Sequence, residues 1–134
     1  LAHHANDQTE TVLLNLIRGS GAEGLKGILP VRGRIIHPLL FATREQISSY
    51  ANRSGLPFVE DLSNRDSRFV RNYLRNEVLP PLVRYFGESA LHGIGRSARL
   101  IAETASGLAS SAAAAVDGMR NDSAFTPAAS NSSE

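Results

Sequence analysis

Eight residues near the start of the chain, from His3 to Glu10, carry the side chains with the clearest capacity for chemistry. They read His-His-Ala-Asn-Asp-Gln-Thr-Glu and so place two imidazoles and two carboxylates in one short stretch. The apolar positions of a helix begin only at Val12, so this stretch lies at the amino end of a predicted helix. Free backbone N–H groups and the helix dipole favour an anion there, and carboxylates suit a cation that accompanies a phosphate. The stretch therefore predicts phosphate and magnesium chemistry.

Two other interpretations of this stretch stay open. His3, His4 and Asp7 could hold a zinc ion, although a zincin helix spaces its two histidines at i and i+4 and this sequence has no such pair. The same three side chains could instead form a hydrogen-bonded helix cap without a catalytic role.

The helix that carries this stretch is expected to run from residue 6 to residue 18 and to end at Gly19. Asp7 and Glu10 have the spacing of a capping box, with Asp in the place of Ser or Thr. The helical period predicts one buried apolar face and one polar face. The buried set is Val12, Leu13, Leu16 and Ile17, and the polar set is Gln8, Thr11, Asn15 and Arg18.

Shorter elements are expected to follow this helix. They are the end of a strand at 1–2, a flexible glycine turn at 19–24, a strand at 34–40 that stops near Pro38, a helix at 44–53, an extended segment at 57–59 and a polar loop at 60–68. Thr43 and Gln46 form a capping box for the helix at 44–53. The glycines of the turn fit a G-x-G-x-x-G pattern, but they follow a helix instead of a strand, so the pattern does not indicate a dinucleotide site.

The second half of the chain is expected to be mainly helical. A helix at 69–79 should break at Pro80 and Pro81. Its core positions would be Val70, Leu74 and Val78. From Glu88 onward, apolar or small residues recur in alternating steps of three and four, which predicts packing against another helix. This stripe comprises Leu91, Ile94, Ala98, Ile101, Ala105, Leu108, Ala112, Ala115 and Met119.

The composition limits the class of protein. The 134 residues contain no cysteine, which excludes disulfides and thiolate metal sites, and the formal net charge is only +1. No apolar run is long enough to span a membrane. Of the 14 basic residues, all except Lys26 are arginine. Arginine suits bidentate contacts with phosphate, although a GC-rich genome would also raise its share.

Several motifs in the first 86 residues resemble those of the PP-loop ATPases, and most closely those of the tRNA(Ile)-lysidine synthetases. The shared motifs are His3-His4-x-x-Asp7-Gln8-x-Glu10-Thr11, Arg18-Gly19-Ser20-Gly21-x-x-Gly24-Leu25, Pro38-Leu39-Leu40 with Arg44, Glu60-Asp61-x-Ser63-Asn64-x-Asp66, and Phe69-x-Arg71-Asn72-x-x-Arg75. The last two motifs make the resemblance specific, because tRNA thiolation enzymes share the first.

The resemblance implies an α/β fold. Residues 1–86 would form the C-terminal part of a doubly wound PP-loop domain of the adenine nucleotide α-hydrolase-like type. Residues 87–120 would form a helical linker or the start of a second helical domain. Residues 121–134 read as a disordered tail, since they are rich in Ser, Asn and Ala.

The resemblance also implies a reaction. ATP adenylates the C2 oxygen of the first anticodon cytidine in an isoleucine tRNA with a CAU anticodon, an amino group of L-lysine attacks C2, and AMP leaves to give lysidine. The implied catalytic residues are His3, His4, Asp7, Glu10 and Arg18, with Mg²⁺ at Asp7. The implied substrate-binding residues are Asp61, Asn64, Arg68, Arg71, Asn72 and Arg75. The enzyme would act in the cytoplasm without a membrane, and a homodimer is left open.

Four of these substrate-binding residues lie at helical spacing and would form one stripe against an RNA backbone. They are Arg68, Arg71, Asn72 and Arg75. Without the resemblance, the same stripe reads as a solvated face with Glu77 and Asp66 as partners.

The sequence departs from the family pattern in two places. Asn6 stands where many relatives carry a second Asp, so no metal role is assigned to it. The phosphate-binding Ser-Gly-Gly-x-Asp-Ser loop does not occur in these residues, so we expect an internal or C-terminal part of a longer enzyme that is inactive by itself. The alternatives are a tRNA thiolation enzyme, whose usual catalytic cysteine is absent here, and a non-catalytic RNA-binding helical module.

Overall fold

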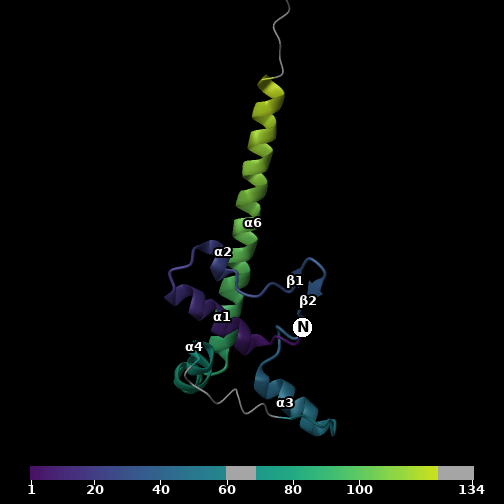
Figure 1. The fold of residues 1–134 in the computed structure, drawn as a ribbon, viewed down its shortest axis with the longest axis vertical. Helices are drawn as coiled ribbons and strands as arrows, with labels where there is room; N and C mark the ends of the chain where they lie inside the picture. The colour runs from purple at the N-terminus through teal and green to yellow at the C-terminus, as the bar shows by residue number, and fades with distance from the viewer. Residues whose placement is uncertain (60–68, 124–134) are drawn as a thin grey trace, which may run out of the picture. The chain divides into compact units, whose positions relative to one another are not determined.

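The computed structural model describes residues 1–59 and 69–123 (Figure 1). It is mostly helical, with one pair of very short strands in the described ranges. The elements are α1 (Ala5–Ile17), α2 (Ala22–Leu25), β1 (Val31–Arg32), β2 (Ile35–Ile36), α3 (Arg44–Arg53), α4 (Val70–Tyr73), the π-helical turn η2 (Leu74–Val78), α5 (Leu79–Phe86) and α6 (Ser89–Ser123). Residues 1–102 form one compact unit, and the rest of α6 belongs to a second unit.

Helix α1 confirms the predicted helix but its predicted buried face only in part, because Val12 alone of the four expected residues is buried. Leu16 and Ile17 are exposed, whereas Gln8 and Glu10 are buried. Gln8 is buried because its amide exchanges two hydrogen bonds with the backbone of Ile28, at 2.6 and 3.1 Å. The buried face of α1 is therefore partly polar, and each of these polar side chains has partners inside the protein.

Of the expected strand at 34–40, only β2 is a strand in the structure, and it pairs antiparallel with β1. Gly33 lies in the turn between them with φ of 60°, a conformation that glycine adopts without strain. The pairing ends before Pro38, which has no N–H to donate. The expected strand end at residues 1–2 is not a strand, and the amino group of Leu1 instead donates to Ile36 O at 2.8 Å.

The glycine segment at 19–24 is more ordered than the flexible turn we expected. Gly19 ends α1 with φ of 71°, and the segment then enters the single helical turn α2. Asn15 donates to Gly24 O at 2.7 Å and ties this turn back to α1.

Helix α3 confirms the predicted capping box. The hydroxyl of Thr43 accepts from Gln46 N at 3.2 Å, and Thr43 N donates to the Gln46 side chain at 2.9 Å. These reciprocal bonds satisfy two N–H groups that the start of a helix leaves free.

The expectation that Pro80 and Pro81 break the helix is wrong. α4, η2 and α5 run on without a gap from Val70 to Phe86. An α-helix would bring each proline ring against the carbonyl four residues earlier. The π-helical turn avoids this clash by widening the helix, and Leu79 N–H donates to Leu74 O, five residues back. Of the three core positions predicted here, Leu74 is buried and Val70 is exposed.

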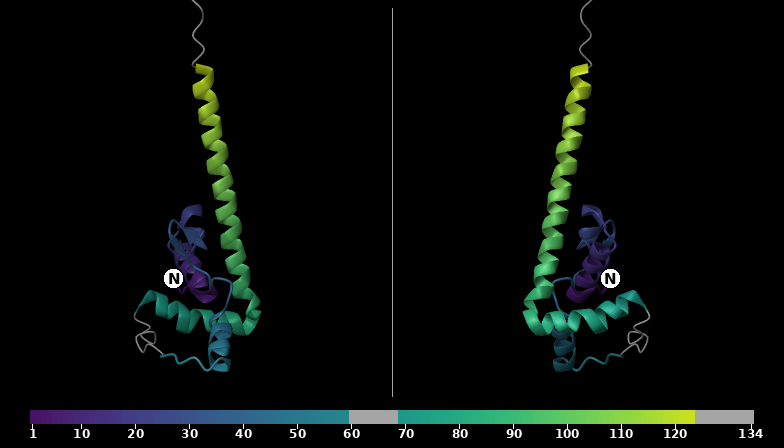
Figure 2. Two further views of the ribbon diagram at one scale, coloured as in Figure 1. Left: turned by 90° about the vertical axis from the view of Figure 1, so that its right-hand side faces the viewer. Right: turned by 90° about the vertical axis from the view of Figure 1, so that its left-hand side faces the viewer.

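Helix α6 is unbroken over 35 residues, as both views in Figure 2 show. In the first unit, Leu91 and Ala98 of the predicted stripe are buried, whereas Leu108 and Met119 in the second unit are exposed. Residues 121–123 belong to the helix, and 124–134 lie outside the described residues. No helix in the described ranges combines the length and apolar character needed to cross a membrane.

Gly27 is expected to be intolerant of a side chain. Its φ is 63°, and a Cβ there would lie 2.6 Å from Gln8 Oε1 and 2.9 Å from a Val12 methyl. Gly27→Ala should lower the free energy of unfolding by about 2 kcal/mol, through backbone strain and lost contact with Gln8. Thermal unfolding followed by circular dichroism measures this. Gly21→Ala is the matched control, because its Cβ would meet open space, and equal effects of the two variants would contradict the explanation.

Candidate active site

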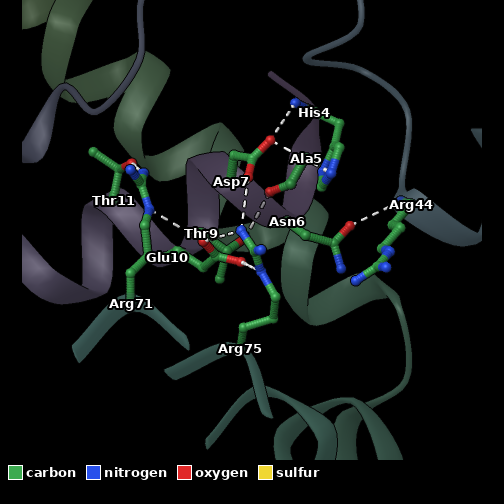
Figure 3. Close-up of polar contacts among 10 residues, drawn as sticks. All are labelled: His4, Ala5, Asn6, Asp7, Thr9, Glu10, Thr11, Arg44, Arg71 and Arg75. Carbon is green, nitrogen blue, oxygen red and sulfur yellow. Dashed lines mark hydrogen bonds and ion pairs between the residues drawn. The ribbon is translucent and has the colours of Figure 1, made fainter. Parts of the chain in front are cut away.

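The carboxylate of Glu10 is fully buried and is held by two arginines from a distant part of the chain (Figure 3). Arg75 donates from Nε to Oε1 at 2.7 Å and from Nη2 to Oε2 at 2.9 Å, which makes a bidentate pair. Arg71 donates from Nε to Oε2 at 3.2 Å and from Nη2 to the Thr11 hydroxyl at 2.5 Å. Two guanidinium groups thus neutralise one carboxylate whose burial would otherwise be very costly.

Asp7 joins this cluster from one helical turn earlier. Its Oδ1 accepts from Arg75 Nη2 at 3.2 Å, and its Oδ2 accepts from His4 N at 3.0 Å. Asp7 and Glu10 are three residues apart and the two arginines four apart, so each pair lies on one face of its helix. We call Asp7, Glu10, Arg71 and Arg75 the ion cluster.

The ion cluster keeps Arg75 charged. The side-chain hydrogen bond to Glu10 raises the pKa of the Arg75 guanidinium above its ordinary value, burial acts in the opposite direction, and the charges of Glu10 and Asp7 add to the increase. Because the pKa is raised, this stabilisation is fully present below the ordinary arginine pKa and is lost only above it. The contribution of Arg75 is therefore constant across neutral pH.

The two histidines before the cluster are only partly satisfied by the chain itself. The Nδ1 atoms of His3 and His4 are buried and have no hydrogen-bond partner in the described ranges. His4 Nε2 lies 3.4 Å from Asp7 Oδ2. Buried polar atoms without partners are rare in folded proteins, so both nitrogens keep hydrogen-bonding capacity for a further group.

His37 is a site residue that the sequence analysis missed. Its ring is buried and lies 4.9 Å from the ring of His3, centroid to centroid. Its Nδ1 lies 2.9 Å from Leu29 O, and because a carbonyl only accepts, this nitrogen carries the proton. The sequence feature that could have indicated His37 is its position directly before Pro38, at the end of an apolar strand.

Asn6 links α1 to α3. Its Oδ1 accepts from Arg44 N at 2.9 Å, at the first turn of α3. A cavity of about 280 Å³ opens beside this contact, and its polar lining comprises His4, Asn6, Arg44, Glu45 and Arg75. Asp7 and Glu10 do not line this cavity, so its polar wall is formed by one histidine, one amide, two arginines and the carboxylate of Glu45.

The donor set of the ion cluster does not fit a magnesium ion. Mg²⁺ prefers six oxygen ligands, including one or two carboxylates. Here both carboxylates already bind Arg75, whose positive charge would repel a cation. Within residues 1–59 and 69–123, no group of three or more His, Asp or Glu side chains could hold a metal. The magnesium role of Asp7 stays a prediction that this geometry does not support.

The structure does not bring every predicted residue to the cluster. Arg18 is exposed at the carboxyl end of α1, eight residues beyond Glu10 and so about 12 Å further along the helix. Asn72 lies in α4 between the two arginines of the cluster. Asp61, Asn64 and Arg68 lie outside the described residues.

The sequence of the chain is similar to that of known proteins. The model of the PP-loop domain family matches residues 1–82. The chain is 43% identical over 105 residues to a tRNA(Ile)-lysidine synthase of Geobacter sulfurreducens, covering 77% of this chain and 22% of the relative. The chain is 46% identical over 108 residues to a tRNA(Ile)-lysidine synthase of Coxiella burnetii, and the match covers 78% of this chain and 24% of the relative. The chain therefore spans less than a quarter of the length of these curated relatives.

Arg75 should stabilise the fold more than Arg71 does. Side-chain exposure is 21% for Arg75 and 45% for Arg71, and Arg75 binds both carboxylates. Arg75→Ala should lower the free energy of unfolding by about 3 kcal/mol, because it leaves buried carboxylate charge without its main partner. Arg71→Ala should cost about 1 kcal/mol, because water screens the more exposed pair. Urea unfolding measures both, with exposed Arg84→Ala as the control, and the reverse order would contradict the assignment.

Proposed function

The chain belongs to the PP-loop domain family, and on that premise we propose that it forms part of a tRNA(Ile)-lysidine synthetase. The enzyme would join L-lysine to the first anticodon cytidine of an isoleucine tRNA with a CAU anticodon. The cytidine C2 oxygen attacks the α-phosphorus of ATP and pyrophosphate leaves. An amino group of lysine then attacks C2, loses a proton, and displaces AMP.

The ion cluster is the observation that carries this proposal. Two motifs that identify the family resemblance, His3–Thr11 and Phe69–Arg75, lie about sixty residues apart in the sequence and share one set of charges around the buried Glu10 here. Charged groups held in fixed positions are what a reaction with developing charge requires.

Within this proposal, the residues divide into two roles. His4 lines the cavity beside Asn6, and Asp7 lies 3.4 Å behind it with a side-chain exposure of 14%, so we propose that His4 contacts the substrates and that Asp7 supplies charge next to it. Glu10 is fully enclosed, and Arg71 and Arg75 are already bonded to it. We therefore propose that the two arginines act as positioning residues instead of the tRNA ligands that the sequence suggested.

We also propose that residues 1–86 form the C-terminal part of a doubly wound PP-loop domain. The phosphate-binding loop and the strands beside it would then come from sequence outside residues 1–134. The share of the relatives that the chain covers supports this proposal. The buried Nδ1 atoms of His3 and His4 fit it as well, because they need partners that residues 1–59 and 69–123 do not provide. The cytoplasmic location and the homodimer stay predictions.

A chimera tests the proposed function. The matched residues of this chain would replace the corresponding segment of the Geobacter sulfurreducens relative, and lysidine formation would be followed with labelled lysine. Asp7→Asn should lower kcat by about 100-fold, because it removes a charge beside the reacting groups, and should leave tRNA affinity unchanged. The exposed Glu77→Gln is the matched control.

Two results would contradict the proposal. One is a chimera that folds and binds tRNA but incorporates no lysine. The other is AMP release from ATP by the 134-residue chain alone, dependent on tRNA and lysine, because that chain has no phosphate-binding loop.

A further inference from the structure

A second cavity lies in the unit of residues 1–102, between α1, the segment before β1, and the first turns of α6. Its volume is about 460 Å³. Its lining includes Ala5 and Gln8 of α1, which are three residues apart on one face of the helix. The ion cluster residues do not line it. The cavity is therefore distinct from the candidate active site, although both are built on α1.

The charged residues of this cavity are all basic. His92, Arg96 and Arg99 occupy positions i, i+4 and i+7 of α6 and so share one face of that helix. Lys26 also lines the cavity, but its Nζ is paired with Glu23 Oε1 at 2.6 Å. Among residues 1–59 and 69–123, no carboxylate lines this cavity, whereas Glu45 lines the cavity beside Asn6 and Glu23 lines the one beside His3. The face of α6 that carries His92, Arg96 and Arg99 would thus attract an anion.

The rest of the lining is apolar and includes an aromatic ring in water. Phe41 lines the cavity and is 76% exposed, so its ring is open to a ligand. The floor beneath is formed by Ile28, Leu29, Pro30, Leu40 and Leu91. An exposed ring beside arginines is the combination that binds unpaired nucleotides, because the ring stacks on a base and the guanidiniums bind phosphates.

We propose that this cavity binds an unpaired segment of RNA, with a base against Phe41 and the flanking phosphates on Arg96 and Arg99. The inference rests on the proposed function, since a tRNA-modifying enzyme must hold RNA on some surface. Arg71 and Arg75, which the sequence offered for that task, are bonded to buried carboxylates instead. His92, Arg96 and Arg99 line a cavity together with the ring of Phe41, and this is the surface to which we assign the RNA.

The test measures binding of the 134-residue chain to a fluorescein-labelled RNA stem–loop whose loop carries a CAU anticodon. Fluorescence anisotropy at several salt concentrations gives the affinity and its salt dependence. The double variant Arg96→Ala/Arg99→Ala should weaken binding about tenfold or more and lower the slope of log affinity against log salt by about 1.4, for two lost phosphate contacts. The control Arg34→Ala/Arg84→Ala removes the same charge from two exposed positions outside the cavity and should have little effect.

The aromatic contact has its own pair of variants. Phe41→Ala should weaken binding about fivefold or more, and Phe41→Tyr, which keeps the ring, should not. Because Phe41 is largely exposed, neither variant should impair folding, which circular dichroism checks.

Four results would each overturn the proposal. They are no RNA binding by the unaltered chain, equal losses of RNA affinity in the two double arginine variants, no loss of RNA affinity in Phe41→Ala, and displacement of the RNA by polyglutamate as effective as displacement by unlabelled RNA.

The chimera separates this inference from the proposed function. There the double arginine variant should raise the KM for tRNA and leave kcat unchanged. If the double arginine variant forms lysidine with an unchanged KM for tRNA, the proposed RNA-binding cavity is wrong and the proposed function is unaffected. Binding of RNA at the cavity without any lysidine formation would overturn the function alone.

Discussion

A carboxylate without access to water must be neutralised inside the protein, and in this chain that requirement joins α1 to the helix of α4 and η2. Glu10 has no exposed surface, and Arg71 and Arg75 provide its partners from more than sixty residues away. Removing one side of such a pair leaves a buried charge, which costs far more than the pair itself contributes. The arrangement of the candidate active site, including the position of Asp7, depends on this contact.

Helix α1 therefore separates two different surfaces. Its face with Asp7 and Glu10 meets arginines and forms a rigid set of charges beside His4. Its face with Ala5 and Gln8 borders the basic cavity of α6. In the proposed enzyme, chemistry and RNA contact would thus lie on two sides of one helix, which would fix the distance between the bound RNA and the reacting groups.

The sequence predicted the local features well and the long-range ones poorly. The start of α3 was predictable because Thr43 and Gln46 satisfy each other within one turn. The buried face of α1 was not, because periodicity treats Glu10 as a solvated residue and cannot detect two distant arginines. The effect of Pro80 was also missed, since a wider helical turn can accommodate a proline that an α-helix cannot. The motifs indicated the family, but only the structure showed that two of them form one cluster.

A double-mutant cycle between Glu10 and Arg75 tests the central claim most directly. The free energy of unfolding would be measured for the unaltered chain, Glu10→Gln, Arg75→Met and the double variant. If the buried pair joins the two helices, the coupling energy should be about 2 kcal/mol or more, and the double variant should be less destabilised than the sum of the single variants. A coupling energy below about 0.5 kcal/mol would show that the two residues act independently and would contradict the account.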